Sequence, residues 1–486
     1  MKRFWLVLLS LGLIIAFSAS AFALDVKVSG EYYTAGMYQN KTTFIKNGYY
    51  STYEGYFQNM YPSDGDPSTA FFYQRLRVQT DFIVSPSLKL VTRFDAMERI
   101  WGGARSAAGT TLDSQSAGTR AENENIAFDW AYVEYTSPIG MFDVGYMDDG
   151  GWGTVFGDSS VPQGILSWAA QTNGWTIFLQ LVKIGDHSRS AITPSTVTDN
   201  DTDKYQGGFF YEWKGNQAGL LTIYYRDAST RPVFTSGGYD VGQTGNVFVL
   251  EPYAIFKIGP VKVQAELNYA FGYIKFDNIN IATANLGDTR VDNLAGWVDA
   301  TVNLKQFYFG GSVAYVAGQD WSYYNNTGQL DVIKGGFLTG GMDWNPTLLL
   351  FNNERHHWAG TIYGNNVTST SMNYLSQIFN LNDTGMYNAW FFQGRAGVRP
   401  TDKLDIMLSL SYAVADSKTL WGCDHDAVSA TYGTEIDLIG NYKITNNLNY
   451  MIGAAYLFTG DYFKGFDPTA QVSDDYLFIN KLTLTF

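Results

Sequence analysis

Alternation of apolar and polar residues with a period of two is the feature that most constrains this 486-residue chain. The clearest example spans residues 261–269, where Val263 and Leu267 are interleaved with Lys262 and Glu266. In a β-strand, successive side chains point to opposite faces of the sheet. The same pattern recurs in further segments, among them 75–84, 403–412 and 435–442. The pattern predicts an all-β chain whose strands each have one apolar and one polar face.

The connections between these segments alternate in length. The chain alternates short turns (85–87, 138–140, 259–260, 401–403) with long polar loops (40–69, 102–124, 186–203, 228–245, 275–290). Aromatic residues gather near the ends of the predicted strands, as at Phe71, Tyr135 and Trp390. Short periplasmic turns, long extracellular loops and aromatic girdles are typical of transmembrane antiparallel β-barrels of the outer membrane. A barrel is therefore favoured over a secreted all-β protein, which would also show alternation.

The composition fits a surface that faces lipid. Charged residues make up 16% of the chain, against about 25% in typical soluble proteins. Aromatic residues contribute another 16%, and the mean hydropathy is −0.14, as alternate lipid-facing and water-facing residues would produce. A helical membrane protein would need several apolar runs of about 20 residues, and the sequence has one such run, at its N-terminus.

The N-terminus has the organisation of a secretory signal peptide. A basic start at residues 2–3 precedes an apolar run at 4–17, and Ala21-Phe22-Ala23 supplies a small-x-small cleavage site. We therefore predict a cleaved signal peptide at residues 1–23 and a barrel domain at 24–486. No cysteine follows the cleavage site directly, which disfavours a lipoprotein anchor.

The charge balance and the cysteine count exclude several classes of protein. Removal of Lys2 and Arg3 leaves 30 of the 32 basic residues against 46 acidic residues, a net charge of −16. So acidic a chain is a poor candidate for binding nucleic acid. Cys423 is the single cysteine, so an internal disulfide is excluded.

The alternating segments amount to about 18 strands, because membrane strands run about 9–11 residues and bacterial barrels use even numbers. The predicted strands are 25–39, 70–84, 88–101, 125–137, 140–150, 164–171, 174–185, 204–213, 217–227, 246–258, 260–274, 291–304, 305–319, 388–399, 402–416, 430–443, 447–460 and 474–486. One long loop remains at 320–387, and a loop of that length argues for a function. Residues 335–351 within it are either a further strand or a segment folded into the lumen, so about 16 or 20 strands are alternatives.

The last strand resembles the C-terminal assembly signal of Gram-negative outer-membrane proteins. Its alternating apolar residues end in a terminal phenylalanine, and they are Tyr476, Phe478, Leu482, Leu484 and Phe486. Asn480 interrupts this apolar face. The resemblance implies recognition by the outer-membrane barrel-assembly machinery.

Two internal stretches resemble porins of the delta-proteobacterial type. They run from Trp130 to Asp158 and from Gly433 to Tyr462, and the second is also similar to the C-terminal region of alginate-export channels. The resemblance implies a cell outer-membrane location, with outer-membrane lipid and lipopolysaccharide as surroundings. It also implies the homotrimer as one assembly state, because trimers are common among porins.

Charged residues on the polar faces of the strands are candidates for the channel lining. An Arg or Lys that faced lipid at mid-depth would cost about 2–4 kcal/mol, and a barrel of about 16–18 strands is wide enough to hold water. The predicted pore-lining residues are Arg75, Arg77, Asp81, Arg93, Asp95, Arg99, Lys262, Glu266, Arg395, Arg399, Glu435 and Asp437.

A glycine-rich acidic stretch near residues 148–158 is a candidate constriction loop. In the porins that it resembles, such a loop folds inward and faces a wall of arginines. We predict Asp148, Asp149 and Asp158 opposite Arg75, Arg77 and Arg93. Opposed charges would orient polar solutes in a transverse field. Two alternatives are salt bridges that only brace the wall and a dedicated ligand site.

Neither an enzyme nor a metalloprotein is indicated. Nucleophilic hydrolysis needs a serine or cysteine beside a base, and the histidines all fall in predicted loops, at His187, His356, His357 and His425. The clusters 354–357 and 423–426 contain metal-ligating residue types without the paired spacing of structural zinc sites. The sequence has no Cys-x-x-Cys-His motif for covalent haem, so no cofactor is predicted.

Together these features predict an outer-membrane porin for passive diffusion of small hydrophilic solutes or ions. The alternative is a substrate-selective channel, for example for export or uptake of an anionic polysaccharide or an organic anion. An open bore with a ladder of Arg and Lys would favour the selective channel, and a folded-in acidic loop would favour the general porin. An adhesin or receptor with a plugged lumen is a third option.

Overall fold

Antiparallel β-strands dominate the computed structural model. It describes residues 25–41, 68–101, 126–186, 200–229, 234–236, 239–241, 243–276, 288–320, 331–353, 385–419, 426–465 and 468–486. The predicted signal peptide at 1–23, the four histidines and Cys423 lie outside the described residues. Of the two clusters with metal-ligating residue types, 354–357 lies wholly outside the described residues and 423–426 is described only at Asp426.

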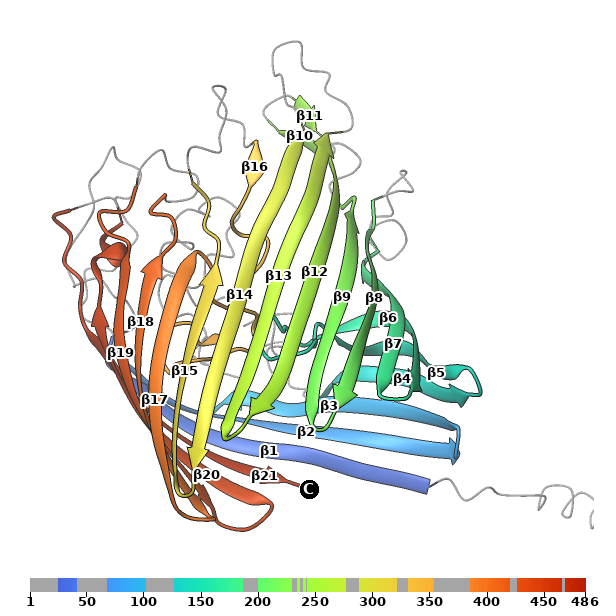
Figure 1. Cartoon of the computed structure of the whole chain (residues 1–486), viewed down its shortest axis with the longest axis horizontal. Coiled ribbons are helices and arrows are strands. Elements are labelled where there is room, and N and C mark those ends of the chain that lie inside the picture. The colour runs from blue at the N-terminus through green and yellow to red at the C-terminus, as the bar shows by residue number, and fades with distance from the viewer. Residues whose placement is uncertain are drawn as a thin grey trace, which may run out of the picture.

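One continuous sheet forms the wall of the molecule (Figure 1). Its first half consists of β1 (Asp25–Gln39), β2 (Thr69–Ser85), β3 (Leu88–Ile100), β4 (Ile126–Ser137), β5 (Gly140–Asp149), β6 (Val161–Thr172), β7 (Trp175–Gly185), β8 (Thr202–Trp213) and β9 (Asn216–Asp227). Its second half consists of β12 (Gln243–Ile258), β13 (Val261–Phe276), β14 (Thr289–Leu304), β15 (Phe307–Val316), β17 (Ala389–Thr401), β18 (Leu404–Ala415), β19 (Thr431–Lys443), β20 (Leu448–Thr459) and β21 (Asp475–Thr485).

Three short strands complete the inventory of the described residues. β10 (Phe234–Ser236) and β11 (Tyr239–Val241) form a separate hairpin, and β16 (Val332–Ile333) pairs in parallel with β14. The remaining 18 strands are antiparallel to their neighbours and form a closed ring. The predicted strand count is confirmed, and each predicted boundary lies within three residues of the observed one, because the alternation that defines a strand is local.

The ring is closed by its first and last strands. β1 pairs with β21 from Glu31 opposite Thr485 to Gln39 opposite Leu477. Two further backbone hydrogen bonds join Gly30 and Phe486, with N···O distances of 2.8 and 3.0 Å. The ring of the terminal Phe486 lies over Gly30, which has no side chain to obstruct it. Closure matters because an unpaired strand edge would leave backbone groups unsatisfied in lipid.

The outer face of the ring is apolar. On β13 the side chain of Leu267 is 45% exposed, whereas the neighbouring Glu266 and Asn268 are 5% and 3% exposed. Leu408, Leu410 and Tyr412 of β18 lie on the outside in the same way, and exposed large apolar residues occur on strands all round the ring. The predicted apolar faces therefore point outward, as a transmembrane barrel requires.

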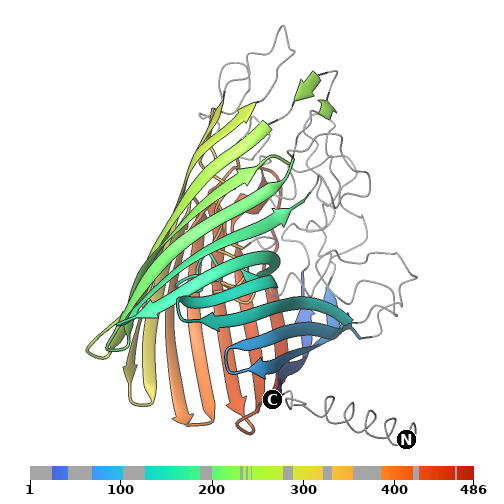
Figure 2. The same ribbon diagram turned by 90° about the vertical axis from the view of Figure 1, so that its right-hand side faces the viewer.

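The connections differ between the two ends of the barrel. Short hairpin turns gather at one end in both side views (Figures 1 and 2). In the turn from β6 to β7, Asn173 and Gly174 both have positive φ, 50° and 84°. This is the backbone of a type I′ turn, which matches the twist of the strands that it joins.

The described residues also contain a 3₁₀-helix, η5 (Asp461–Lys464), after β20. No helix among the described residues combines the length and the apolarity needed to span a membrane.

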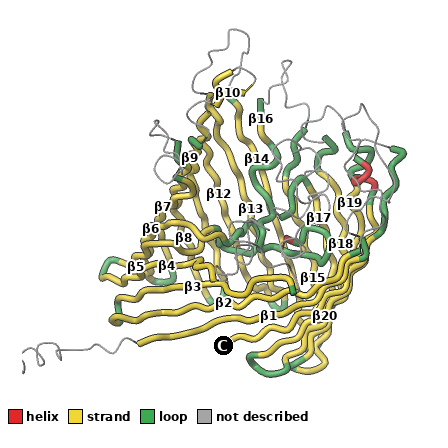
Figure 3. Tube along the Cα trace, turned by 180° about the vertical axis from the view of Figure 1, so that it is seen from behind, coloured by secondary structure: helices red, strands yellow, loops and turns green. Residues whose placement is uncertain are grey.

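The largest buried hydrophobic cluster lies inside the ring. It combines inward-facing side chains of the wall, such as Phe391 and Tyr432, with Trp344, Leu349 and Phe351 of the connection between β15 and β17. Seen from behind, loop segments drawn in green cross the inside of the barrel (Figure 3). Residues 335–351 are therefore a segment folded into the lumen, which was one of the two options that the sequence left open. Among the described residues of this connection, only β16 joins the wall.

Gly30 offers a test of ring closure. A Cβ atom there would collide with the backbone oxygen of Arg77 and would lie 2.7 Å from Cζ of Phe486. We expect Gly30→Ala to lower the free energy of unfolding by about 1–3 kcal/mol, as overpacking does. Denaturant unfolding in detergent micelles, followed by tryptophan fluorescence, measures the change.

Gly394 on β17 provides the matched control, because a Cβ atom at this position would meet nothing within 4 Å. Gly394→Ala should unfold like the wild type. Equal stabilities of the Gly30 and Gly394 variants would contradict the proposed importance of this contact.

Candidate functional site

Two segments of the chain narrow the lumen. The first is the loop at 150–160 between β5 and β6, here the 150–160 loop, and the second is 331–353 between β15 and β17, here the docked segment. They touch each other: the amide of Gly157 donates to the oxygen of Gly340 at 2.9 Å. The amide and hydroxyl of Ser160 donate to the Asp343 carboxylate at 2.9 and 2.7 Å. The two segments therefore form one joined structure inside the barrel.

The 150–160 loop is fixed to the wall by hydrogen bonds. The amide and hydroxyl of Thr154 donate to Glu266 of β13 at 3.0 and 2.6 Å. The indole Nε1–H of Trp152 donates to the backbone oxygen of Glu251 at 2.8 Å. Gly153 has a φ of 63° and lies directly against the ring of Tyr253, where a Cβ atom would be 2.5 Å from Cγ. The glycines of this stretch thus allow the close approach that brings the loop onto the wall.

An aromatic contact joins the 150–160 loop to the docked segment. Phe156 is fully buried, and its ring centroid lies 6.2 Å from that of Trp297 on β14 and 5.3 Å from that of Trp344. Trp344 in turn packs edge-on against Phe391 of β17 at 5.5 Å. Full burial of one such side chain stabilises by about 1.5–3 kcal/mol. The contact between the 150–160 loop and the docked segment is therefore a dry, packed interior.

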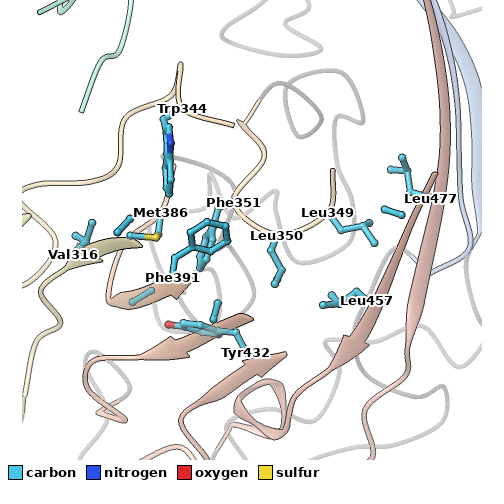
Figure 4. Packing of buried hydrophobic residues seen from close by; sticks show 14 of the residues in the cluster. Val316, Trp344, Leu349, Leu350, Phe351, Met386, Phe391, Tyr432, Leu457 and Leu477 are labelled. Atoms are coloured by element: carbon cyan, nitrogen blue, oxygen red, sulfur yellow. The ribbon is translucent and has the colours of Figure 1, made fainter. Parts of the chain in front are cut away.

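The docked segment is held by a carboxyl group. Glu435 of β19 is fully buried and accepts the backbone N–H groups of Leu348, Leu349 and Leu350 at 3.1, 2.7 and 2.8 Å. Figure 4 shows the buried hydrophobic side chains of this region, with Phe351 beside Phe391 and Leu350 above Tyr432. The backbone N–H groups of three consecutive residues are thereby satisfied in a buried place.

At its other end the docked segment is held by Asn293 of β14. The Asn293 side-chain oxygen accepts the amides of Phe337 and Leu338 at 3.1 and 2.6 Å. Asp437, two residues from Glu435, accepts the Ser409 hydroxyl at 3.0 Å. Anchors on strands both before and after the docked segment fix it across the inner face of β14 to β19.

The opposite side of the lumen carries a charged wall, which we define as Arg75, Arg77, Arg93, Asp95 and Asp129 on β2 to β4. Arg77 makes two parallel bonds to Asp95, both of 2.7 Å, and Arg93 and Arg77 share Asp129 at 3.2 and 3.4 Å. The side chains of the three arginines are 13–29% exposed, whereas Glu435 is not exposed at all. The charged wall therefore faces the open part of the lumen.

Aromatic rings accompany the arginines of the charged wall. The guanidinium carbon of Arg93 lies 3.5 Å from the ring centroid of Trp130, and that of Arg75 lies 5.0 Å from that of Tyr33. Among the described residues, the Nε–H groups of Arg75 and Arg93 have no hydrogen-bond acceptor. Each of these arginines thus keeps one donor that its carboxylate neighbours do not use.

The acids of the predicted constriction loop are dispersed. Asp148 and Asp149 belong to strand β5 and not to the loop. Asp149 forms a buried ion pair with Lys204 of β8 at 2.5 Å. Asp148 is the one acid of the three that acts electrostatically on Arg93. Arg77 and Arg93 are instead neutralised by Asp95 and Asp129, which lie on adjacent strands in direct register or one residue away. Arg75 lies 4.0 Å from Glu31 and 3.9 Å from Glu98.

Asp158 is the loop acid that faces inward from the 150–160 loop. Its carboxyl oxygen accepts the amide of Trp152 at 2.8 Å. Burial raises the pKa of Asp158 to about 8, although the bond from Trp152 lowers it, and the neighbouring Asp343 carboxylate adds a smaller increase. A carboxyl group with this pKa is mostly protonated at neutral pH, so it contributes no full charge to a transverse field.

Most other predicted lining residues lie on the inner face. Arg395 pairs with Asp299 at 2.6 Å, and Arg399 pairs with Asp405 at 2.8 Å. Asp81 is 3.8 Å from Lys89, and Lys262 opposes Thr301 on the same inward-facing side of β13 and β14. Glu266, Glu435 and Asp437 also face inward, but they hold the two inner segments in place rather than facing water.

Arg99 is the exception among the predicted lining residues. A register shift between Gln74 and Leu76 inserts an extra residue in β3 at Met97, whose φ is 53°. Such a bulge exchanges the two faces of the strand beyond it. Arg99 consequently lies opposite Gln74 on the outward side, and we remove it from the lining set.

The sequence alone did not reveal several residues of the site. Asp129 was missed because a register shift in β4 breaks the strict alternation at this place. As a result, two neighbouring residues, Asp129 and Trp130, both contact inward-facing arginines. Asp343 lies in a stretch without any strand pattern, and Lys204 precedes a run of alternating residues that is only weakly polar. The one local signal available was for Asp129, an acid next to a tryptophan near the start of a predicted strand.

The residues of the C-terminal strand lie on the outward face. Phe478, Leu484 and Phe486 are 55%, 38% and 50% exposed. Tyr476 packs against Phe478 on the same face, and Leu482 is partly covered. Asn480, which interrupts the apolar face, donates to the backbone oxygen of Gly36 on β1 at 3.4 Å. The polar interruption therefore lies at the seam of the ring.

Metal chemistry finds no support in the described part of the chain, where no group of three or more His, Cys, Asp and Glu side chains is arranged to hold an ion.

Comparisons with known proteins bear on the fold. No protein-family model matches the sequence, and no curated protein matches it. Solved structures that align over the whole chain include OccK8 (OprE) of Pseudomonas aeruginosa, with 11% identity over 95% of this chain and 98% of that one at a TM-score of 0.47. OpdK of the same organism, solved with vanillate, aligns with 10% identity over 95% and 98% at a TM-score of 0.46.

A third structure is the anion-selective porin from Comamonas acidovorans, with 9% identity over 95% of this chain and 99% of that one at a TM-score of 0.42. These neighbours are Gram-negative outer-membrane porins. At such low identities and TM-scores, the likeness does not indicate which solute this chain binds. The narrower resemblance to delta-proteobacterial porins and alginate-export channels has no counterpart among the family models.

The anchor at Glu435 generates a prediction. In Glu435→Gln the amide nitrogen replaces one acceptor oxygen, so at least one of the three bound N–H groups loses its partner. A buried unsatisfied donor costs about 1–3 kcal/mol, so amide hydrogen exchange at 348–350 should accelerate roughly 5- to 150-fold. Exchange followed by mass spectrometry on the barrel in micelles measures this effect.

Glu134→Gln is the matched control, because Glu134 pairs with Lys89 on β3 and touches neither inner segment. It should leave exchange at 348–350 unchanged. Unaltered exchange in Glu435→Gln as well would show that the docked segment is held by other contacts.

Proposed function

We propose that this chain is an outer-membrane porin for passive diffusion of small hydrophilic solutes or ions. The single observation that carries the proposal is the asymmetric lumen of a closed 18-strand ring. One side is filled by the 150–160 loop and the docked segment, and the other side exposes the charged wall to water. A barrel of this size is wide enough to leave an aqueous channel after partial filling.

The proposal includes the route to the membrane. Residues 1–23 would be removed as a signal peptide, and the barrel at 24–486 would be inserted by the barrel-assembly machinery, for which the outward residues of β21 are the recognition signal. The apolar outer face would contact outer-membrane lipid and lipopolysaccharide. A homotrimer is part of the proposal only through the resemblance to porins. No enzymatic step is assigned.

A second candidate, selectivity for organic anions, is favoured by one specific observation. The side chains of Arg75 and Arg93 are partly exposed, at 22% and 13%. An anion would find charge-assisted hydrogen-bond donors on the exposed parts of these guanidinium groups. The paired carboxylates Asp95 and Asp129 oppose this reading, because they already neutralise much of the positive charge.

Charge reversal in the charged wall tests the ion pathway. Exchanging Arg75 or Arg93 for glutamate moves two unit charges, which at roughly 10 Å in water changes the energy of a passing ion by about 0.8 kcal/mol. The cation gains and the anion loses this energy, about fourfold each, so the ratio of cation to anion permeability should rise roughly 16-fold in Arg75→Glu and Arg93→Glu. Reversal potentials in planar bilayers under a low-salt gradient measure this ratio.

Arg290→Glu serves as the control, because Arg290 is exposed and bonded to Asp292 near the long-loop end of β14. Its selectivity should equal that of the wild type. Unchanged selectivity in both wall variants would exclude the charged wall from the ion pathway, and the absence of any stepwise conductance in the wild type would exclude a channel.

A further inference from the structure

A hollow of about 440 Å³ lies beneath the 150–160 loop, on the side of the lumen away from the charged wall. Its principal lining residues come from five elements, and they are Trp152, Asp158, Phe210, Gln217, Tyr253 and Gln264. Phe210 and Gln217 flank the short turn between β8 and β9, so the hollow opens toward the short-turn end of the barrel. Pockets of about 300–1,000 Å³ are typical for small organic ligands.

The aromatic part of the hollow is held rigidly. The ring of Trp152 stands edge-on to that of Tyr253 at 5.0 Å and to that of Phe210 at 6.3 Å. Its indole nitrogen is already bonded to Glu251, so the ring cannot rotate without losing that bond. Gly153 and Gly219 lie close against Tyr253, which fixes the ring of Tyr253 as well. The hollow therefore presents preformed apolar surfaces.

The polar groups of the hollow are neutral and unused. Within the described part of the chain, neither the Gln264 carboxamide nor the Tyr253 hydroxyl has a hydrogen-bond partner, and Gln217 uses only its amide nitrogen, on Glu212. An amide and a phenol each supply both donors and acceptors. The described residues of the lining include no lysine, arginine or histidine. Asp158, with its raised pKa of about 8, is mostly a neutral donor at pH 7.

From this combination we propose that the hollow is a binding subsite for a neutral polyhydroxylated solute of the size of a mono- or disaccharide. The inference rests on the proposed channel function for the arrival of the solute in the lumen. Sugar rings have an apolar face that packs on aromatic side chains, and their hydroxyls pair with amide, phenol and carboxyl groups. An organic anion would find no cation in this lining, so the subsite and the charged wall select different solutes.

Calorimetric titration of the purified full barrel in detergent micelles tests the subsite directly, with maltose and glucose as probes. The wild type should show saturable binding, and glucuronate, the charged counterpart of glucose, should bind at least fivefold more weakly. Gln264→Leu removes the free carboxamide at similar size, and Tyr253→Phe removes only the hydroxyl. Each should weaken sugar binding at least fivefold.

Gln79→Leu is the matched control, because Gln79 faces the lumen from β2, away from the hollow, with its side chain bonded to Asp81. It should bind the sugars like the wild type. Retained heat-resistant migration of each variant on a gel verifies that the barrel has folded.

Three results would overturn the proposal: no saturable binding of either sugar by the wild type, equal affinity in Gln264→Leu and the wild type, or tighter binding of glucuronate than of glucose. Because calorimetry does not require ion flow, its outcome is separate from that of the conductance measurement. A barrel that binds maltose without conducting ions would refute the channel and keep the subsite. A barrel that conducts ions but binds no sugar would refute the subsite and keep the channel.

Discussion

Backbone hydrogen bonding in a medium without water is the constraint on which the whole structure depends. Every strand needs a partner on both edges, and the first and last strands, β1 and β21, provide the final pairing. A ring of 18 strands encloses more volume than the inward side chains can fill. The interior must therefore contain either water or other parts of the chain, and in this barrel the 150–160 loop and the docked segment fill one side of it.

The division of the lumen follows from how acidic side chains are used. On β13 and β19, Glu266 and Glu435 are buried and accept N–H groups of the 150–160 loop and the docked segment. On β3 and β4, Asp95 and Asp129 pair with arginines of the neighbouring strands. The same residue type is thus an anchor on one side and half of an ion pair on the other. The difference lies in the partner, which is a backbone amide of an inner segment on one side and a guanidinium group of the wall on the other.

Sequence patterns predicted the strands of the barrel wall well, and they predicted the segments and side-chain contacts inside the lumen poorly. Alternation is a local property, so even the ends of β13 could be assigned from the residues themselves. Arg99 was misassigned because one extra residue at Met97 exchanges the faces of β3, and a bulge leaves no mark in the alternation on either side of it. The partners of Glu435 lie about 85 residues earlier in the chain, and such distant pairing has no signature in the spacing of residues. The arginines predicted to face acids across the lumen instead found carboxylate partners on neighbouring strands, where the distance is shorter.

The position of the docked segment has a consequence for the order of folding. Its anchors lie on β14, made before it, and on β19, made after it, while the ring-closing pair Gly30 and Phe486 includes the last residue of the chain. Contacts so far apart in sequence form slowly. If the ring closed first, the docked segment could enter the lumen only through one of the two ends of the barrel. The simpler order is that β14 to β19 fold around the docked segment as an open sheet and that β1 pairs with β21 last. The docked segment would then already lie in the lumen before β1 pairs with β21.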